Sequence, residues 1–141
     1  MSRLRLGLEM DGSSRGRQVR DVVQALAWAT PVRGALLVAP DGFAIAAEVP
    51  SGLAVEPLAA LVATLGRELE VGASRLGRGA FQTAMFSAND GTLFLAASRI
   101  GFVVALAESQ GNVPAIRAAL EEAVTAIDSS WAPSASAAAA T

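Results

Sequence analysis

Two turn motifs constrain the fold of this 141-residue chain more than any other feature of its sequence. Pro40-Asp41-Gly42 and Asn89-Asp90-Gly91 each separate two short apolar runs. In such turns proline presets φ, aspartate can bond its own backbone and glycine accepts a positive φ, and Asp-Gly between apolar runs is a strong hairpin signal. Together with the connection at 98–101, they predict five strands, at residues 34–39, 43–48, 79–87, 92–97 and 102–108.

The segments between and after these strands have apolar residues at helical spacing. We predict helices over 18–29, 57–72 and 114–127, the last with Asn112 as its N-cap. The resulting order is helix, two strands, helix, three strands, helix. This order predicts an α/β (α+β) fold, namely a three-layer α/β/α sandwich with a five-stranded antiparallel sheet.

The predicted helix 57–72 carries two apolar stripes. One consists mostly of large side chains and is expected to face the core: Leu58, Leu61, Val62, Leu65 and Leu69. The other consists of small residues, Ala59, Ala63 and Gly66, which let another backbone approach closely. We interpret the small stripe as a second buried face of the helix. The alternative is an alanine-rich face exposed to solvent.

The two ends of the chain differ from its middle. Leu4, Leu6, Leu8 and Met10 alternate with polar or small residues, which indicates an extra strand at an edge of the sheet. Five arginines among the first twenty residues fit a basic arm equally well. We therefore divide the chain into an N-terminal arm or edge strand, one domain and a disordered Ala/Ser-rich tail, at residues 1–16, 17–130 and 131–141.

Cysteine, histidine, tyrosine and lysine are all absent from the sequence. Their absence excludes metal ligation through Cys or His, a Ser-His-Asp triad and a lysine-bearing phosphate loop. We therefore predict no catalytic, cofactor-binding or metal-binding residues, no cofactor and no enzymatic activity. A net charge of −2 argues against nucleic acid as a partner. No apolar run is long enough to span a membrane, and we expect a cytoplasmic protein.

The order and spacing of these segments resemble the roadblock/dynein light-chain superfamily over about residues 17–128. The resemblance is carried by five stretches that follow one another at the family's spacing. They are 32–38 (VRGALLV) with 41–43 (DGF), 58–63 (LAALVA), 90–95 (DGTLFL), 102–106 (FVVAL) and 111–117 (GNVPAIR).

This resemblance implies a homodimer in which the central helices pack together and two strand edges join into one sheet. It points to helix 57–72 and strand 79–87, with interface candidates Ala59, Ala63, Gly66, Phe81 and Thr83. Bacterial and archaeal members often occur beside Ras-like small GTPases. The resemblance therefore implies a non-catalytic regulator or scaffold that binds such a GTPase and modulates its GTP hydrolysis, with Arg75 and Arg78 as candidate partner contacts. The alternatives are a ligand-sensing domain and a purely structural scaffold without a GTPase partner.

Overall fold

The computed structural model describes residues 14–108 and 112–131. Its elements are, in chain order, α2 (Ser14–Trp28), β1 (Val32–Val38), β2 (Ala44–Glu48), α3 (Val55–Arg75), β3 (Thr83–Ala88), β4 (Gly91–Ala97), β5 (Phe102–Ala107) and α4 (Val113–Trp131). This is the order predicted from the turns and the apolar spacing. The predicted N-terminal strand and the alanine-rich tail after Trp131 lie outside the described residues.

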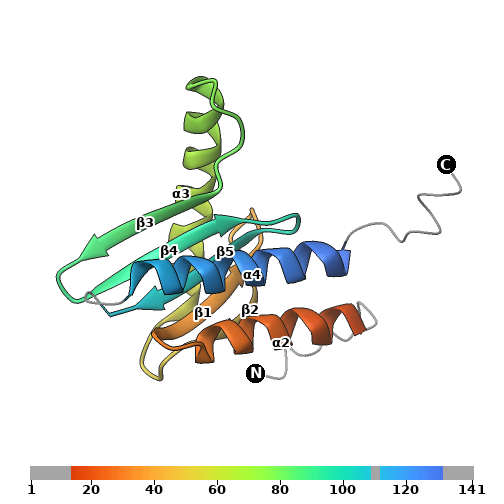
Figure 1. The fold of residues 1–141 in the computed structure, drawn as a ribbon, viewed down its shortest axis with the longest axis vertical. Coiled ribbons are helices and arrows are strands. Elements are labelled where there is room, and N and C mark those ends of the chain that lie inside the picture. The colour runs from red at the N-terminus through yellow and green to blue at the C-terminus, as the bar shows by residue number, and fades with distance from the viewer. Residues whose placement is uncertain (1–13, 109–111, 132–141) are drawn as a thin grey trace, which may run out of the picture.

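The five strands form one antiparallel sheet in the order β2-β1-β5-β4-β3 (Figure 1). The last three strands form an antiparallel meander through the predicted turn at 89–91 and the connection at 98–101. β1 and β5 lie at the centre, where Leu36 pairs with Val104, and both are almost continuously apolar because helices cover both of their faces. β2 and β3 are the two edge strands of the described sheet.

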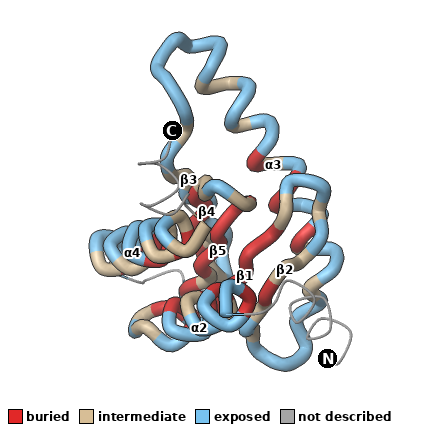
Figure 2. Tube along the Cα trace, turned by 90° about the vertical axis from the view of Figure 1, so that its right-hand side faces the viewer, coloured by how far each residue is buried: buried red, intermediate tan, exposed pale blue. Residues whose placement is uncertain are grey.

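Helices cover both faces of this sheet, so the predicted three-layer sandwich is confirmed. α2 and α4 pack side by side on one face (Figures 1 and 2). Their apolar stripes and the sheet enclose one core, whose helical members include Val19, Val23, Ile116, Leu120 and Ile127. α3 covers the opposite face alone, where Val62 packs with sheet residues such as Phe102 in a second core.

Only the first part of α3 lies on the sheet. At 21 residues the helix is about 32 Å long, and all of its fully buried residues precede Arg67. At that point the Arg67 guanidinium donates a hydrogen bond to the carbonyl of Pro40 in the turn between β1 and β2. The remainder of α3 projects beyond the sheet, as Figures 1 and 2 show.

The local signals in the sequence act as predicted. In the first hairpin, Asp41 Oδ1 accepts a hydrogen bond from the Phe43 N–H at 3.2 Å, and Gly42 has a φ of 98°. At the start of α4, Asn112 Oδ1 accepts a hydrogen bond from the Ala115 N–H at 3.1 Å, which confirms the predicted N-cap.

Several boundaries differ from the prediction, and three of them change the extent of the domain or of an edge strand. α2 begins earlier, at Ser14, so the residues directly before 17 belong to the domain. β3 begins only at Thr83, and Gly79, where the strand was predicted to begin, has a φ of 87°, which extended strands do not adopt. α4 continues to Trp131, which packs against the core between the helices and the sheet. Trp131 is therefore part of the domain and not of the tail.

Candidate interaction surface

The small residues of α3 face the sheet of their own chain. Ala59 and Ala63 are 1% and 2% exposed, and Gly66 is buried as well. A Cβ atom built on Gly66 would lie 2.5 Å from the ring of Phe102. The close approach that Gly66 permits is thus made to β5 of the same chain. In the stripe predicted to face the core, Val62 is fully buried, Leu58, Leu65 and Leu69 pack partly against the same core, and only Leu61 is exposed.

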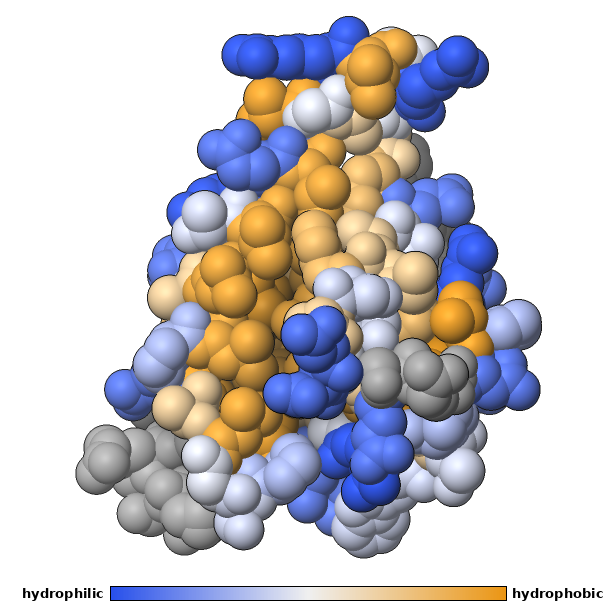
Figure 3. Space-filling model, turned by 90° about the vertical axis from the view of Figure 1, so that its left-hand side faces the viewer, coloured by the Kyte–Doolittle hydropathy of each residue, from blue (hydrophilic) through white to orange (hydrophobic). Residues whose placement is uncertain are grey.

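The leucines of α3 flank the small stripe and reach the surface. They recur at helical spacing and continue to the C-cap of the helix, and we call them the leucine face: Leu58, Leu61, Leu65, Leu69 and Leu76. Leu61 is 51% exposed and Leu76 is 76% exposed, whereas the other three are half-buried. Figure 3 shows apolar side chains gathered in a band that runs from the sheet up along the projecting helix.

The edge strand β3 adds aromatic side chains on the same side of the sheet. Phe86 is 39% exposed and pairs directly with Leu93, which packs against the α3 core. Directly paired residues point to the same face, so Phe86 lies on the α3 side. Phe81, just before β3, is half-buried against that core. Thr83 at the start of the strand is half-buried too, but it pairs with Ala96 of the other core and therefore points to the face covered by α2 and α4. Helix and strand therefore both present apolar side chains on this face of the sheet, beside its open edge.

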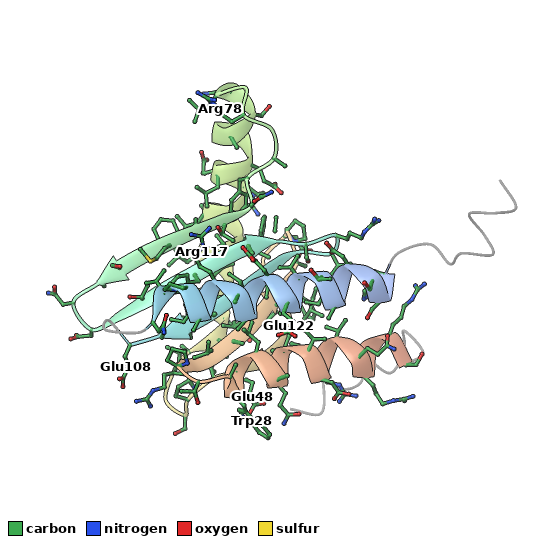
Figure 4. The ribbon with its side chains drawn as sticks, in the orientation of Figure 1. Trp28, Glu48, Arg78, Glu108, Arg117 and Glu122 are labelled. Carbon is green, nitrogen blue, oxygen red and sulfur yellow. The ribbon has the colours of Figure 1, made fainter. Side chains whose placement is uncertain are left out.

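The two arginines predicted to contact a partner lie at the projecting end of α3. Arg75 occupies the last turn of the helix, and Arg78 lies in the loop that follows (Figure 4). Both are exposed. A cation in the last turn interacts favourably with the helix dipole, which is a structural role for Arg75. Neither arginine forms an ion pair within the described ranges. The charged tip stands apart from the sheet and leaves both guanidinium groups accessible.

Within residues 14–108 and 112–131, no cluster of carboxylates could hold a metal ion, and Thr92 is the only buried polar residue. Charged side chains do converge in a groove between α2 and β2, which is lined by Arg17, Arg20, Asp21 and Glu48. None of the helices in this part of the chain is long and apolar enough to cross a bilayer.

Solved structures of other proteins have the same arrangement of elements. MglB from Myxococcus xanthus superposes with a TM-score of 0.77 at 14% identity, over 83% of this chain and 90% of that one. The gliding protein MglB from Thermus thermophilus gives 0.73 at 20% identity, over 84% and 91%. A Roadblock/LC7 domain from Streptomyces avermitilis gives 0.69 at 16% identity, over 77% and 92%. The chain has the roadblock fold. No protein-family model and no curated protein matches the sequence.

Within this roadblock fold, α3 and β3 are the elements that the sequence predicted for the interface, but the prediction missed their most exposed apolar residues. Leu61 was assigned to the core, and Leu76 and Phe86 were not singled out. One signal pointed to Leu76, because it lies seven residues after Leu69 and continues the leucine spacing past the predicted helix end. Contact of Ala59, Ala63 and Gly66 with a second copy stays a prediction. Because these residues are buried, the exposed leucine face is the better candidate for such a contact.

Proposed function

We propose that this chain is a non-catalytic homodimer that binds and regulates a Ras-like small GTPase. The observation that carries the dimer is the leucine face, together with the exposed Phe86 on the same face of the sheet. Monomeric soluble proteins rarely expose contiguous apolar patches of this kind. A helix that projects from its own domain also needs tertiary packing, because helices gain most of their stability from an apolar face that is covered.

A two-fold axis beside β3 would both cover the exposed apolar patch and give the projecting end of α3 a packing partner. The leucine face of one protomer would cover that of its partner, and the projecting end of each α3 would gain a surface to pack against. The outer edges of the two β3 strands would pair and extend the five-stranded sheets into one, which removes an exposed edge from each copy. Leu61 and Leu76 would lie inside this interface, whereas the charged tip with Arg75 and Arg78 would stay at its rim.

The GTPase partner rests on the resemblance to the roadblock superfamily, which the shared fold supports. A dimer offers one composite surface made from two copies of the tip and the nearby sheet. The switch segments of a Ras-like GTPase are ordered by the γ-phosphate and are released on hydrolysis. A protein that contacts those segments can therefore favour the GTP-bound state by differential affinity alone.

No catalytic group of this chain is needed for such regulation. The sequence has no histidine, cysteine or lysine to serve as a general base or nucleophile. If the dimer accelerates GTP hydrolysis, it does so by positioning residues that the GTPase itself supplies. The purified protein is expected to hydrolyse no nucleotide on its own.

Isothermal titration calorimetry tests the proposal with a Ras-like GTPase encoded in the same genome. We expect tighter binding to the form loaded with a non-hydrolysable GTP analogue than to the GDP form. Changing Arg75 and Arg78 together to Glu is expected to weaken binding by at least about tenfold, since each swap reverses an accessible charge. Arg117→Glu, an exposed charge reversal on α4, is the matched control. Equal affinity for both nucleotide forms contradicts the switch mechanism, and no binding contradicts the GTPase partner.

A further inference from the structure

The second edge of the sheet, β2, stays unpaired in the proposed dimer. β2 pairs with β1 on one side only, so the backbone groups on its outer side have no partner strand within the described residues. Natural sheets rarely leave an edge open, because another chain can add to it. β2 contains neither proline nor lysine to prevent such pairing, and its sequence is AIAAE. Something in the protein is therefore expected to cover this edge.

A charged groove lies along one face of that edge. It has a volume of about 360 Å³ and runs between α2 and β2, where Arg17, Arg20 and Asp21 on the helix face Glu48 on the strand. The Nε atom of Arg20 is buried there and has no hydrogen-bond partner among the described residues. A buried donor without an acceptor is costly. The groove thus calls for an occupant that brings a carboxylate or a carbonyl oxygen to Arg20.

The opposite face of the same edge is apolar. Ala47 and Val49 pack at the margin of the α3 core, together with Val55 and Leu58 from the first turns of α3. A strand added beside β2 would therefore meet charged groups on one face and apolar groups on the other. Because side chains alternate between the faces of a strand, the matching sequence alternates polar and apolar residues.

We propose that residues 4–10 of this chain add to β2 as a sixth strand. Leu4, Leu6, Leu8 and Met10 would lie on the α3 side, and Arg5 and Glu9 would point into the groove. Seven extended residues span about 23 Å, which is enough to cover the five residues of β2. The segment is also tethered at the right place, since only residues 11–13 separate it from α2.

The direction of the chain brings opposite charges together. Residues 29–31 alone connect α2 to β1, so these two elements run in opposite directions, and β2 runs antiparallel to β1. A strand that leads into the start of α2 must then run antiparallel to β2, like every other pair in this sheet. In this direction Arg5 lies toward Glu48, and Glu9 lies toward Arg17 and Arg20. The added strand would supply the missing acceptor for Arg20.

Hydrogen exchange of the full chain tests this proposal and needs no GTPase. The β2 amides that do not donate to β1 are expected to exchange at least tenfold more slowly than unstructured amides. Leu6→Pro is expected to abolish this protection, because proline removes a donor and disrupts strand pairing, while the amides of β1 and β5 stay protected. Ala135→Pro, in the alanine-rich tail, is the matched control.

Charge-reversal variants give a second test, with the same hydrogen-exchange readout. Glu48→Arg is expected to reduce the protection of β2, and Arg5→Glu in the same chain is expected to restore it. Fast exchange of the outer β2 amides in the unmodified chain would overturn the proposal, and so would unchanged exchange in Leu6→Pro. Protection that grows with protein concentration would also overturn it, because a second copy would then occupy the edge. These results are independent of GTPase binding, so the two proposals can fail separately.

Discussion

Gly66 on α3 lies directly against the aromatic ring of Phe102 on β5, where an added Cβ atom would come within 2.6 Å of three ring carbons. The contact lets the helix backbone sit close to the sheet, with Ala59 and Ala63 in the same row. It also fixes the rotation of α3 about its axis. With the small stripe against the sheet, Leu61 and Leu76 are exposed, whereas Leu58, Leu65 and Leu69 pack partly against the same core.

Gly66→Ala is therefore expected to destabilise the protein, although alanine is the better helix former. The new methyl group must displace the Phe102 ring or the helix, and overpacking of this kind costs about 1–3 kcal/mol. Gly72→Ala is the matched control, because a Cβ at that position meets no atom within 4 Å. Chemical denaturation followed by circular dichroism measures both. A Gly66→Ala protein as stable as Gly72→Ala would contradict the packing described for α3.

Ala63→Arg tests the rotation of α3 about its axis by placing a charged side chain against the sheet. Ala63 is 2% exposed against the sheet, so an arginine there is expected to unfold the domain or cost more than about 4 kcal/mol. Ala60→Arg, on the exposed side of the same helix, is expected to leave the fold intact. Thermal melts of the two variants make the comparison. A folded Ala63→Arg protein that has merely lost self-association would restore the original prediction for the small stripe.

Arg15 and Trp131 join the start of α2 to the end of α4. The Arg15 Cζ atom lies 5.0 Å from the centre of the Trp131 ring, within the range of a cation–π contact. Arg15→Ala is expected to lower the free energy of unfolding by about 0.5–1 kcal/mol, and Arg15→Lys by less. The fluorescence of Trp131 provides a local readout, with Trp28→Phe as the background. Unchanged stability and unchanged emission would show that the contact contributes nothing.

Asn112 caps α4 through its side-chain oxygen. Asn112→Ala is expected to cost about 1 kcal/mol, because the Ala115 N–H loses its acceptor. Asn112→Asp keeps an acceptor and is expected to retain the stability. Equal denaturation midpoints for the alanine and aspartate variants would contradict the capping role.

Most of the fold could be predicted from the sequence because its determinants are local. The turns at Pro40-Asp41-Gly42 and Asn89-Asp90-Gly91 fix two hairpins through the conformations of their own residues. The rotation of α3 could not be predicted in this way. Both of its stripes are apolar at helical spacing, and the choice between them depends on the fit of Gly66 to Phe102, a residue 36 positions away.

Contacts between residues that are distant in the sequence also explain why several surface features were not predicted. The groove between α2 and β2 combines Arg17 and Arg20 with Glu48, which no motif connects in the sequence. The exposure of Leu61 follows from the rotation of α3, and that of Leu76 from the projection of the helix past the sheet. Arg75 and Arg78 could be assigned to an exposed element end from the sequence alone. Their role in binding a partner stays a prediction.

The most direct test of the account is the mass of the protein in solution. Sedimentation equilibrium at micromolar concentration is expected to give twice the 14.3 kDa chain mass. Leu61→Arg, which places a charge on the exposed leucine face, is expected to give the mass of one folded chain. Trp28→Arg, an equally drastic change at a 69% exposed residue on α2, is expected to leave the dimer intact. A monomeric unmodified protein, or a dimer that Leu61→Arg does not dissociate, would contradict the assignment of the leucine face as the interface.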